Sequence, residues 1–301
     1  MSLIALLLAH VIEYGLTTVL HLREPRWLDH YCDWAEKLLA GRRGWLLVMA
    51  AAFLLLLPAI PVGYAYVLLG SHLLGLPQLA FAVLVLLLSF GPRDLRVEVQ
   101  DYLAALDRGD RDEAARRATE LLEVDAAGRG AGLREAVEEA IFVQANNRIF
   151  GVVFWFVVLG PAGAWLFRVS DLMRRRAAFE AVRRGAPVER GSFGWALAFI
   201  HGLLAWIPAR LAAGTYALAG SFEDALGNWR VTVDTVGTGI LDRSEDLLAR
   251  VGKGSLQSGL ASVAPGDLDR AAAAGAWRIV SRAVWIWLVF VAILVLAGQA
   301  T

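Results

Sequence analysis

Six polar residues lie within apolar runs or in the polar segments next to them: Glu13, Asp29, Asn146, Asn147, Arg148 and Arg210. Glu13 lies inside the apolar run 2–20, and Arg210 lies inside the apolar run 195–219. An ionisable group within an apolar span usually faces protein or water and marks a functional site. A carboxylate paired with an arginine for packing, or an arginine at the interface, is the structural alternative. These residues are our candidate polar site.

The tripeptide Asn146-Asn147-Arg148 precedes a second apolar run, 149–167. The first turn of a helix leaves backbone N–H groups free, and an arginine adds a fixed charge, so this position could hold an anion. An ordinary cap with an arginine reaching to the interface explains the same residues. Asp29 is predicted to cap a short helix within the polar segment 21–44.

Common sequence motifs of nucleotide-binding and hydrolytic enzymes are absent from this sequence. It contains no phosphate-binding Gly-x₄-Gly-Lys-Ser/Thr loop and no Gly-x-Ser-x-Gly elbow. The five histidines show no metal-ligand spacing, and the single Cys32 excludes an internal disulfide. Ser170-Asp171 does not form a recognisable triad pattern, and Arg174–Arg176 is predicted to face lipid headgroups. We therefore assign no catalytic residue, no metal ligand and no cofactor from motifs.

Charge and hydropathy decide the class of protein. The chain has 301 residues, 57% of them hydrophobic, and its 29 basic and 29 acidic residues balance, which excludes a basic field for nucleic acid. Residues 45–90 contain no Lys, Arg, Asp or Glu. A helix needs about 20 apolar residues to cross a bilayer, so this stretch predicts a hairpin of two spans, 45–68 and 73–90.

The predicted fold is an all-α polytopic membrane protein forming one membrane-embedded domain, 1–301. Four full spans are expected, at 2–20, 45–68, 73–90 and 277–298. The runs 149–167 and 195–219 are interrupted by Gly160-Pro161 and by Pro208, which weaken helices, so they are predicted to be broken or re-entrant. Six full spans is the alternative.

Arginine and lysine concentrate in four helical, polar segments: 21–44, 91–148, 168–194 and 220–276. The positive-inside rule places all four in the cytoplasm. Within 91–148, the pattern predicts a helix over 94–107, a turn at Gly109-Asp110, a second helix behind it, and a third helix that begins near 133.

Several stretches, taken in order, resemble the AmpE family of inner-membrane proteins over nearly the whole chain. They are Glu13, Trp27-Leu28-Asp29-His30, Tyr102-Leu103 with Gly109-Asp110, Asn146-x-Arg148 with Phe154-Trp155, and Ile207–Leu211 with Tyr216-Ala217-Leu218. The resemblance implies a bacterial inner-membrane sensor or regulator linked to induction of the AmpC β-lactamase. It implies partners among murein-recycling components or a muropeptide, in addition to the lipid bilayer.

AmpE is in turn similar to the CobD/CbiB family, membrane synthases that join an aminopropanol arm to a corrinoid using ATP. Those synthases carry Asn-Thr-Leu-Asp-Ser-Met after the Gly-Pro break, where this chain reads Val169–Arg174. The difference favours the regulator. The alternative is an ATP- and Mg²⁺-dependent amide ligase, which needs Glu13, Asn147, Arg148 and Arg210 to converge. A lipid- or amphiphile-handling protein is a third hypothesis.

Overall fold

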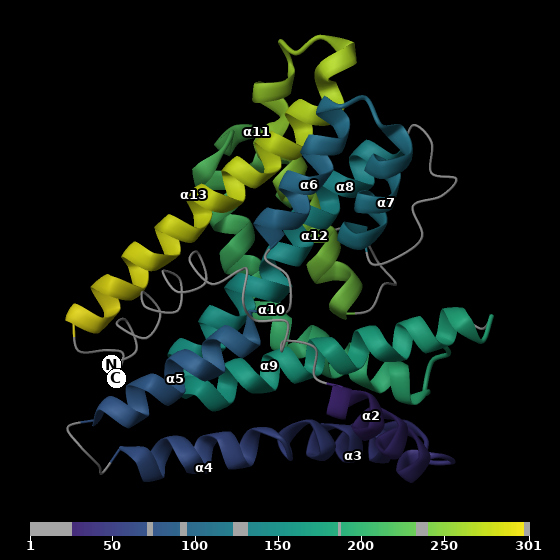
Figure 1. Cartoon of the computed structure of the whole chain (residues 1–301), viewed down its shortest axis with the longest axis vertical. Coiled ribbons are helices and arrows are strands. Elements are labelled where there is room, and N and C mark those ends of the chain that lie inside the picture. The colour runs from purple at the N-terminus through teal and green to yellow at the C-terminus, as the bar shows by residue number, and fades with distance from the viewer. Residues whose placement is uncertain are drawn as a thin grey trace. The chain divides into compact units, whose positions relative to one another are not determined.

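The computed structural model describes residues 26–70, 75–90, 95–122, 132–185, 188–232 and 240–297, and within these ranges every regular element is a helix (Figure 1). This confirms the all-α fold class. The predicted span 2–20, with Glu13, and the hairpin tip at 71–73 lie outside the described residues. The chain divides into two compact units, Met1–Pro92 with Gly151–Ala205 and Val291–Thr301, and Arg93–Phe150 with Trp206–Phe290. The expectation of one domain stays a prediction, and the units are described in turn.

Unit 1 contains α2 (Arg26–Leu39), α3 (Gly44–Leu56), α4 (Ala59–Leu69), α5 (Leu76–Ser89), α9 (Gly151–Arg183) and the first part of α10 (Phe193–Ala219). Helix α2 buries Leu28, Cys32, Ala35 and Leu39, which share one face at helical spacing. This face packs on α3 and α9 in a single apolar cluster. Asp29 lies in the first turn of α2, three residues after its start, so it is not the N-cap that the sequence predicted.

Among the described residues, four helices are long and apolar enough to cross a membrane: Gly44–Leu69, Leu133–Arg183, Phe193–Ala219 and Pro265–Leu294. Gly44–Leu69 covers the predicted span 45–68 but is interrupted at Leu57-Pro58, between α3 and α4. Helix α5 is apolar but only 14 residues long, shorter than the predicted span 73–90. Whether the runs 149–167 and 195–219 span or re-enter stays a prediction.

The predicted break in 149–167 is confirmed within α9. Gly160 has φ 67° and ψ −157°, a backbone conformation that residues with a Cβ rarely adopt, and Pro161 follows it. At the kink the backbone comes close to the preceding turn, because a Cβ on Gly163 would lie 2.3 Å from the carbonyl oxygen of Trp155. Glycine is therefore required at both positions.

Helix α10, in contrast, continues through the proline that was expected to interrupt it. Pro208 has no N–H to donate to the carbonyl of Leu204, four residues earlier. The indole Nε1 of Trp155 donates to that carbonyl at 3.0 Å instead. A side chain of α9 thus supplies the hydrogen bond that the proline removes, and the helix remains continuous.

Unit 2 contains α6 (Leu95–Asp107), α7 (Arg111–Leu122), α8 (Leu133–Ala145), the π-helix η4 (Asn146–Phe150), the second part of α10, α11 (Phe222–Thr232), α12 (Ile240–Leu260), η5 (Pro265–Asp267) and the part of α13 (Leu268–Leu296) up to Phe290. The predicted helical hairpin is confirmed as α6 and α7. Gly109 turns the chain with φ 69°, and the Oδ1 of Asp110 accepts the N–H of Glu113 at the start of α7.

Helix α12 packs tightly on two neighbours through glycines. A Cβ on Gly252 would lie 2.3 Å from the ring of Phe142 on α8, and one on Gly254 would lie 2.8 Å from the carbonyl oxygen of Asp224 on α11. Phe142 is fully buried and also contacts the ring of Tyr216 on α10. The ring therefore has no free space to move into when α12 gains volume.

We expect Gly252→Ala to lower the free energy of unfolding by about 1–3 kcal/mol, because the added methyl group overpacks the core against Phe142. The matched control is Gly227→Ala on α11, where a Cβ meets no atom within 4 Å. The melting temperature of the detergent-solubilised protein measures both variants. Equal melting temperatures for the two variants would contradict the packing described for α12.

Candidate functional site

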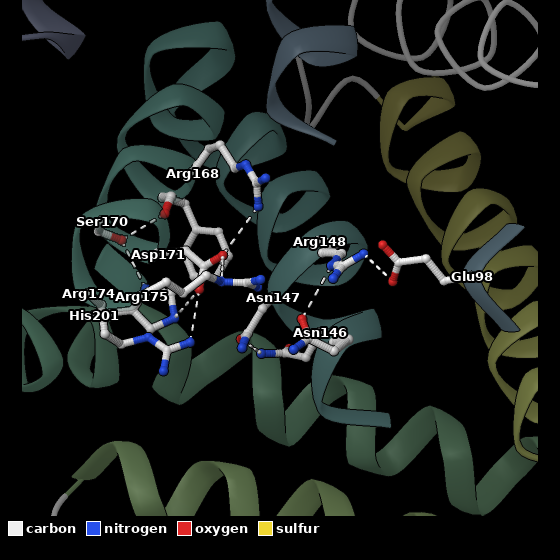
Figure 2. A network of polar contacts seen from close by, with 12 residues as sticks. Glu98, Asn146, Asn147, Arg148, Arg168, Ser170, Asp171, Arg174, Arg175 and His201 are labelled. Carbon is white, nitrogen blue, oxygen red and sulfur yellow. Dashed lines mark hydrogen bonds and ion pairs between the residues drawn. The ribbon is translucent and has the colours of Figure 1, made fainter. Parts of the chain in front are cut away.

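In unit 1 a buried carboxylate is surrounded by arginines of its own helix. Asp171, fully buried on α9, contacts Arg168 at 3.2 Å, Arg174 at 2.9 Å and Arg175 at 2.8 Å (Figure 2). The spacings of three and four residues place the four side chains on one helical face. Because an isolated charge is strongly disfavoured in apolar surroundings, the opposite charges of these groups compensate one another there. We call these four residues the Asp171 cluster.

This arrangement corrects the prediction that Arg174–Arg176 faces lipid headgroups. The side chains of Arg174 and Arg175 are only 16% and 18% exposed and point to Asp171. Arg176 contacts Asp29 on α2 at 3.1 Å and Glu180 on its own helix at 3.6 Å. The sequence signal was available, since an Arg-x₂-Asp-x₂-Arg-Arg pattern at the end of an apolar run predicts ion pairs along one helix.

Ser170 and His201 join the Asp171 cluster from α9 and α10. The Oγ of Ser170 lies 2.9 Å from the Nδ1 of His201 and donates to the carbonyl oxygen of Phe167 at 2.7 Å. Which of Oγ and Nδ1 donates to the other depends on the tautomer of the imidazole. Nε2 lies 3.8 Å from the Oδ1 of Asp171 and has no hydrogen-bond partner among the described residues.

These three residues do not form a nucleophilic triad, although they are Ser, His and Asp. In a triad the serine hydroxyl donates to the imidazole, which then removes its proton. Here Asp171 makes no hydrogen bond to the imidazole, because its Oδ1 lies 3.8 Å from Nε2, so the ring lacks the carboxylate partner that a triad needs. All three side chains are also fully buried. The contact between Ser170 and His201 could not be predicted from the sequence, because the two residues are 31 positions apart.

In unit 2 the predicted residues Asn146, Asn147 and Arg148 form most of the π-helix η4. Single π-helical turns are frequent at functional sites because they redirect side chains. The sequence suggested that Arg148 could hold an anion, but the side chain is paired within the protein. Its Nη1 donates to Glu98 on α6 at 2.8 Å, and its Nε donates to Gln144 at 3.3 Å (Figure 2). Glu98 is itself buried, so this is an enclosed ion pair.

The two asparagines beside this ion pair are buried and only partly satisfied. The Nδ2 of Asn146 donates to the Oδ1 of Asn147 at 3.3 Å. The Oδ1 of Asn146 and the Nδ2 of Asn147 have no partner among the described residues. A buried amide without its hydrogen bonds is unfavourable, and such groups often interact with a water or ligand that completes them. The asparagines therefore remain candidates for a binding role.

The other predicted site residues have local partners. Arg210, on α10, donates to the carbonyl oxygen of Trp206 at 2.9 Å and lies 4.0 Å from the centre of the Trp206 ring. The side chain of Asp29 is half-exposed and pairs with Arg176 in unit 1. Glu13 lies outside the described residues, so its convergence with Asn147, Arg148 and Arg210 stays a prediction. Among the described residues of unit 2, no hydrogen bond or ion pair joins Arg210 to η4.

The single cysteine is not a reactive group. Burial raises the pKa of the Cys32 thiol on α2 to about 12, because the apolar surroundings disfavour the thiolate. Only the thiolate attacks electrophiles, so Cys32 stays protonated and inert near neutral pH.

Asp171→Asn is expected to destabilise unit 1 by about 3–5 kcal/mol, because it leaves one buried and two partly buried guanidinium groups without their carboxylate. The matched control is Asp29→Asn, which removes an exposed ion pair and should cost about 1 kcal/mol or less. Melting temperatures in detergent, followed by tryptophan fluorescence, compare the two variants. If Asp171→Asn melted with the control, the cluster would not contribute to the stability of the helix packing.

Comparison with known proteins identifies the family. Residues 6–238 match the family described as CobD/Cbib protein. A "Cobalamin biosynthesis protein CobD" of Stutzerimonas stutzeri is 37% identical over 53% of this chain and 51% of its own length. A protein of the same name from Chromobacterium violaceum is 27% identical over 71% and 70% of the two chains. "Protein AmpE" of Shigella flexneri is 30% identical over 56% of this chain and 61% of that protein.

The match thus spans about half the length of the Stutzerimonas relative. No solved structure matches the chain. The apolar helices and these bacterial relatives together describe a multi-pass bacterial membrane protein. With most of its length matched to one family, the chain belongs to the CobD/CbiB family.

Proposed function

We propose that this chain is a non-catalytic inner-membrane regulator of the AmpE type. In this role it links the state of the cell wall, through a muropeptide or a murein-recycling protein, to induction of the AmpC β-lactamase. The relative from Shigella flexneri, 30% identical over 56% of this chain, and the ordered motifs from Glu13 to Leu218 support this proposal. The polar helices α6 and α7 of unit 2 offer the contact surface that a regulator needs, since their outer faces carry many charged side chains.

The observation that carries the proposal is the enclosure of Asp171. An ATP-dependent ligase holds its Mg²⁺ with carboxylates whose oxygens are free to bind the ion. Both carboxylate oxygens of Asp171 are already in contact with guanidinium groups, from Arg168, Arg174 and Arg175. A cation would meet an excess of positive charge in this cluster. The described residues of the Asp171 cluster therefore do not fit a magnesium ion.

An amide-forming ligase of the CobD/CbiB type, using ATP and Mg²⁺, is the second candidate. One specific observation favours it beyond the names of the two CobD relatives. The synthase signature Asn-Thr-Leu-Asp-Ser-Met can also be aligned with Arg168–Met173 instead of Val169–Arg174. In this alignment Asp171 and Met173 match the fourth and sixth residues of the signature. The excess of arginines around Asp171 would suit an anionic substrate group rather than the metal.

We expect the chain to restore β-lactamase induction in a bacterium that has an inducible AmpC enzyme and lacks its own AmpE. The physical reason is that a regulator acts through its folded surface and needs no chemical turnover. Enzyme activity in cells treated with a β-lactam inducer is the measurement, with the empty vector as control. Unchanged induction would contradict the regulatory role.

A second complementation experiment separates the two candidates. In a strain that lacks its corrinoid amide synthase, the chain should fail to restore growth that depends on the completed corrinoid. Purified protein should likewise release no ADP or AMP with ATP, an aminopropanol and a corrinoid acid. Growth or nucleotide release that Asp171→Glu abolishes, with the protein still folded, would establish the ligase and overturn the regulator.

The proposed orientation, with the polar segments in the cytoplasm, predicts the labelling of Arg183→Cys. This side chain lies at the end of α9 and is 71% exposed, so a thiol there is accessible on whichever side it faces. We expect an impermeant maleimide to label it only after the inner membrane is opened. Cys32, buried and inert, gives the unlabelled background in the parent protein. Labelling in intact spheroplasts would place this segment outside.

A further inference from the structure

A groove of about 230 Å³ lies in unit 2 between the end of α12 and the first half of α13. Two arginines, Arg270 and Arg278, are the only charged residues that line it, and the rest of the lining consists of Leu, Val, Ala and Gly. Gly259 lines it on the α12 side, and a Cβ there would meet no atom within 4 Å. The groove thus combines an apolar floor with a positive rim.

The two arginines differ in how their charges are compensated. Arg270 forms an ion pair with Asp107 of α6. Arg278 is exposed and has no carboxylate within ion-pair distance in the described part of the chain. One turn further on, Arg282 donates to the carbonyl oxygen of Ala219. Arg278 is therefore the cation on this side of α13 that is available to an anion.

The position of the groove along α13 indicates which anion. The stretch Pro265–Leu294 is long and apolar enough to cross a membrane, and no charged residue follows Arg282 in α13. The residues just before such an uncharged run lie at the level of the lipid headgroups. Basic residues at this level attract anionic lipid by about 1 kcal/mol each.

We propose that this groove binds an anionic phospholipid. The phosphate pairs with Arg278, and part of one acyl chain lies along the apolar floor beside Leu256, Gly259 and Gly275. An arginine next to an apolar groove favours a ligand that has both a negatively charged headgroup and an acyl chain. The proposal concerns unit 2 alone and does not depend on the regulatory role.

The test uses the full chain in detergent, titrated with phosphatidylglycerol or phosphatidylcholine, with retained lipid counted by native mass spectrometry. We expect the wild type to retain phosphatidylglycerol more strongly. Arg278→Gln should remove that preference, and Arg278→Lys should keep most of it. Gly259→Leu, which adds a side chain to the lining of the groove where a Cβ meets no atom within 4 Å, should weaken retention of phosphatidylglycerol to the level of Arg278→Gln.

The matched controls are Arg230→Gln and Gly227→Leu, both at exposed positions of α11 outside the groove, and both should retain lipid as the wild type does. Equal retention of the two lipids by the wild type would overturn the proposal. So would equal behaviour of Arg278→Gln and Arg230→Gln. If Arg278→Gln weakened retention but Gly259→Leu did not, or if inorganic phosphate alone displaced the lipid, the site would bind a free anion and the acyl contact would be wrong.

Discussion

Pairing of charges in apolar surroundings is the constraint on which this structure depends. A membrane-spanning helix can carry ionised side chains only where other protein groups take the place of water. Asp171 and its three arginines meet that requirement within one face of α9, and Glu98 and Arg148 meet it between α6 and η4. Removing one partner costs more than removing the whole group, because the remaining charge has no solvent. The ionic clusters therefore hold the polar ends of the apolar helices in place.

Backbone hydrogen bonding imposes a related constraint. A proline within a helix leaves a carbonyl without its donor, and hydrocarbon offers no water to replace it. At Leu204 the donor is the indole of Trp155, so α10 stays continuous through Pro208. At Gly160, just before Pro161, the chain instead kinks through a conformation that glycine tolerates. Two similar sequence signals thus give two different results.

Membership of the CobD/CbiB family describes the scaffold more firmly than the chemistry. The family includes proteins named for cobalamin biosynthesis, and one relative bears the name AmpE. In this chain the polar centre of α9 is filled by arginines that contact the buried carboxylate of Asp171. A site arranged in this way favours stability and anion recognition over metal-dependent turnover. The regulator is therefore proposed ahead of the ligase.

The sequence by itself determined the membrane class, the helical hairpin of α6 and α7, and the break at Gly160. These features follow from local rules: the length of uncharged runs, the turn at Gly109-Asp110, and the conformational freedom of glycine before proline. The ion pairs within α9 were also within reach of the sequence, because their spacing is helical.

Only the tertiary structure decided the partners of residues distant along the chain. Ser170 with His201, Glu98 with Arg148, and Trp155 with Leu204 are 31 to 50 positions apart, and no periodicity relates them. Each contact depends on how two helices rotate and slide against each other. That geometry is fixed by the packing of side chains such as Phe142 against Gly252, which sequence patterns do not specify.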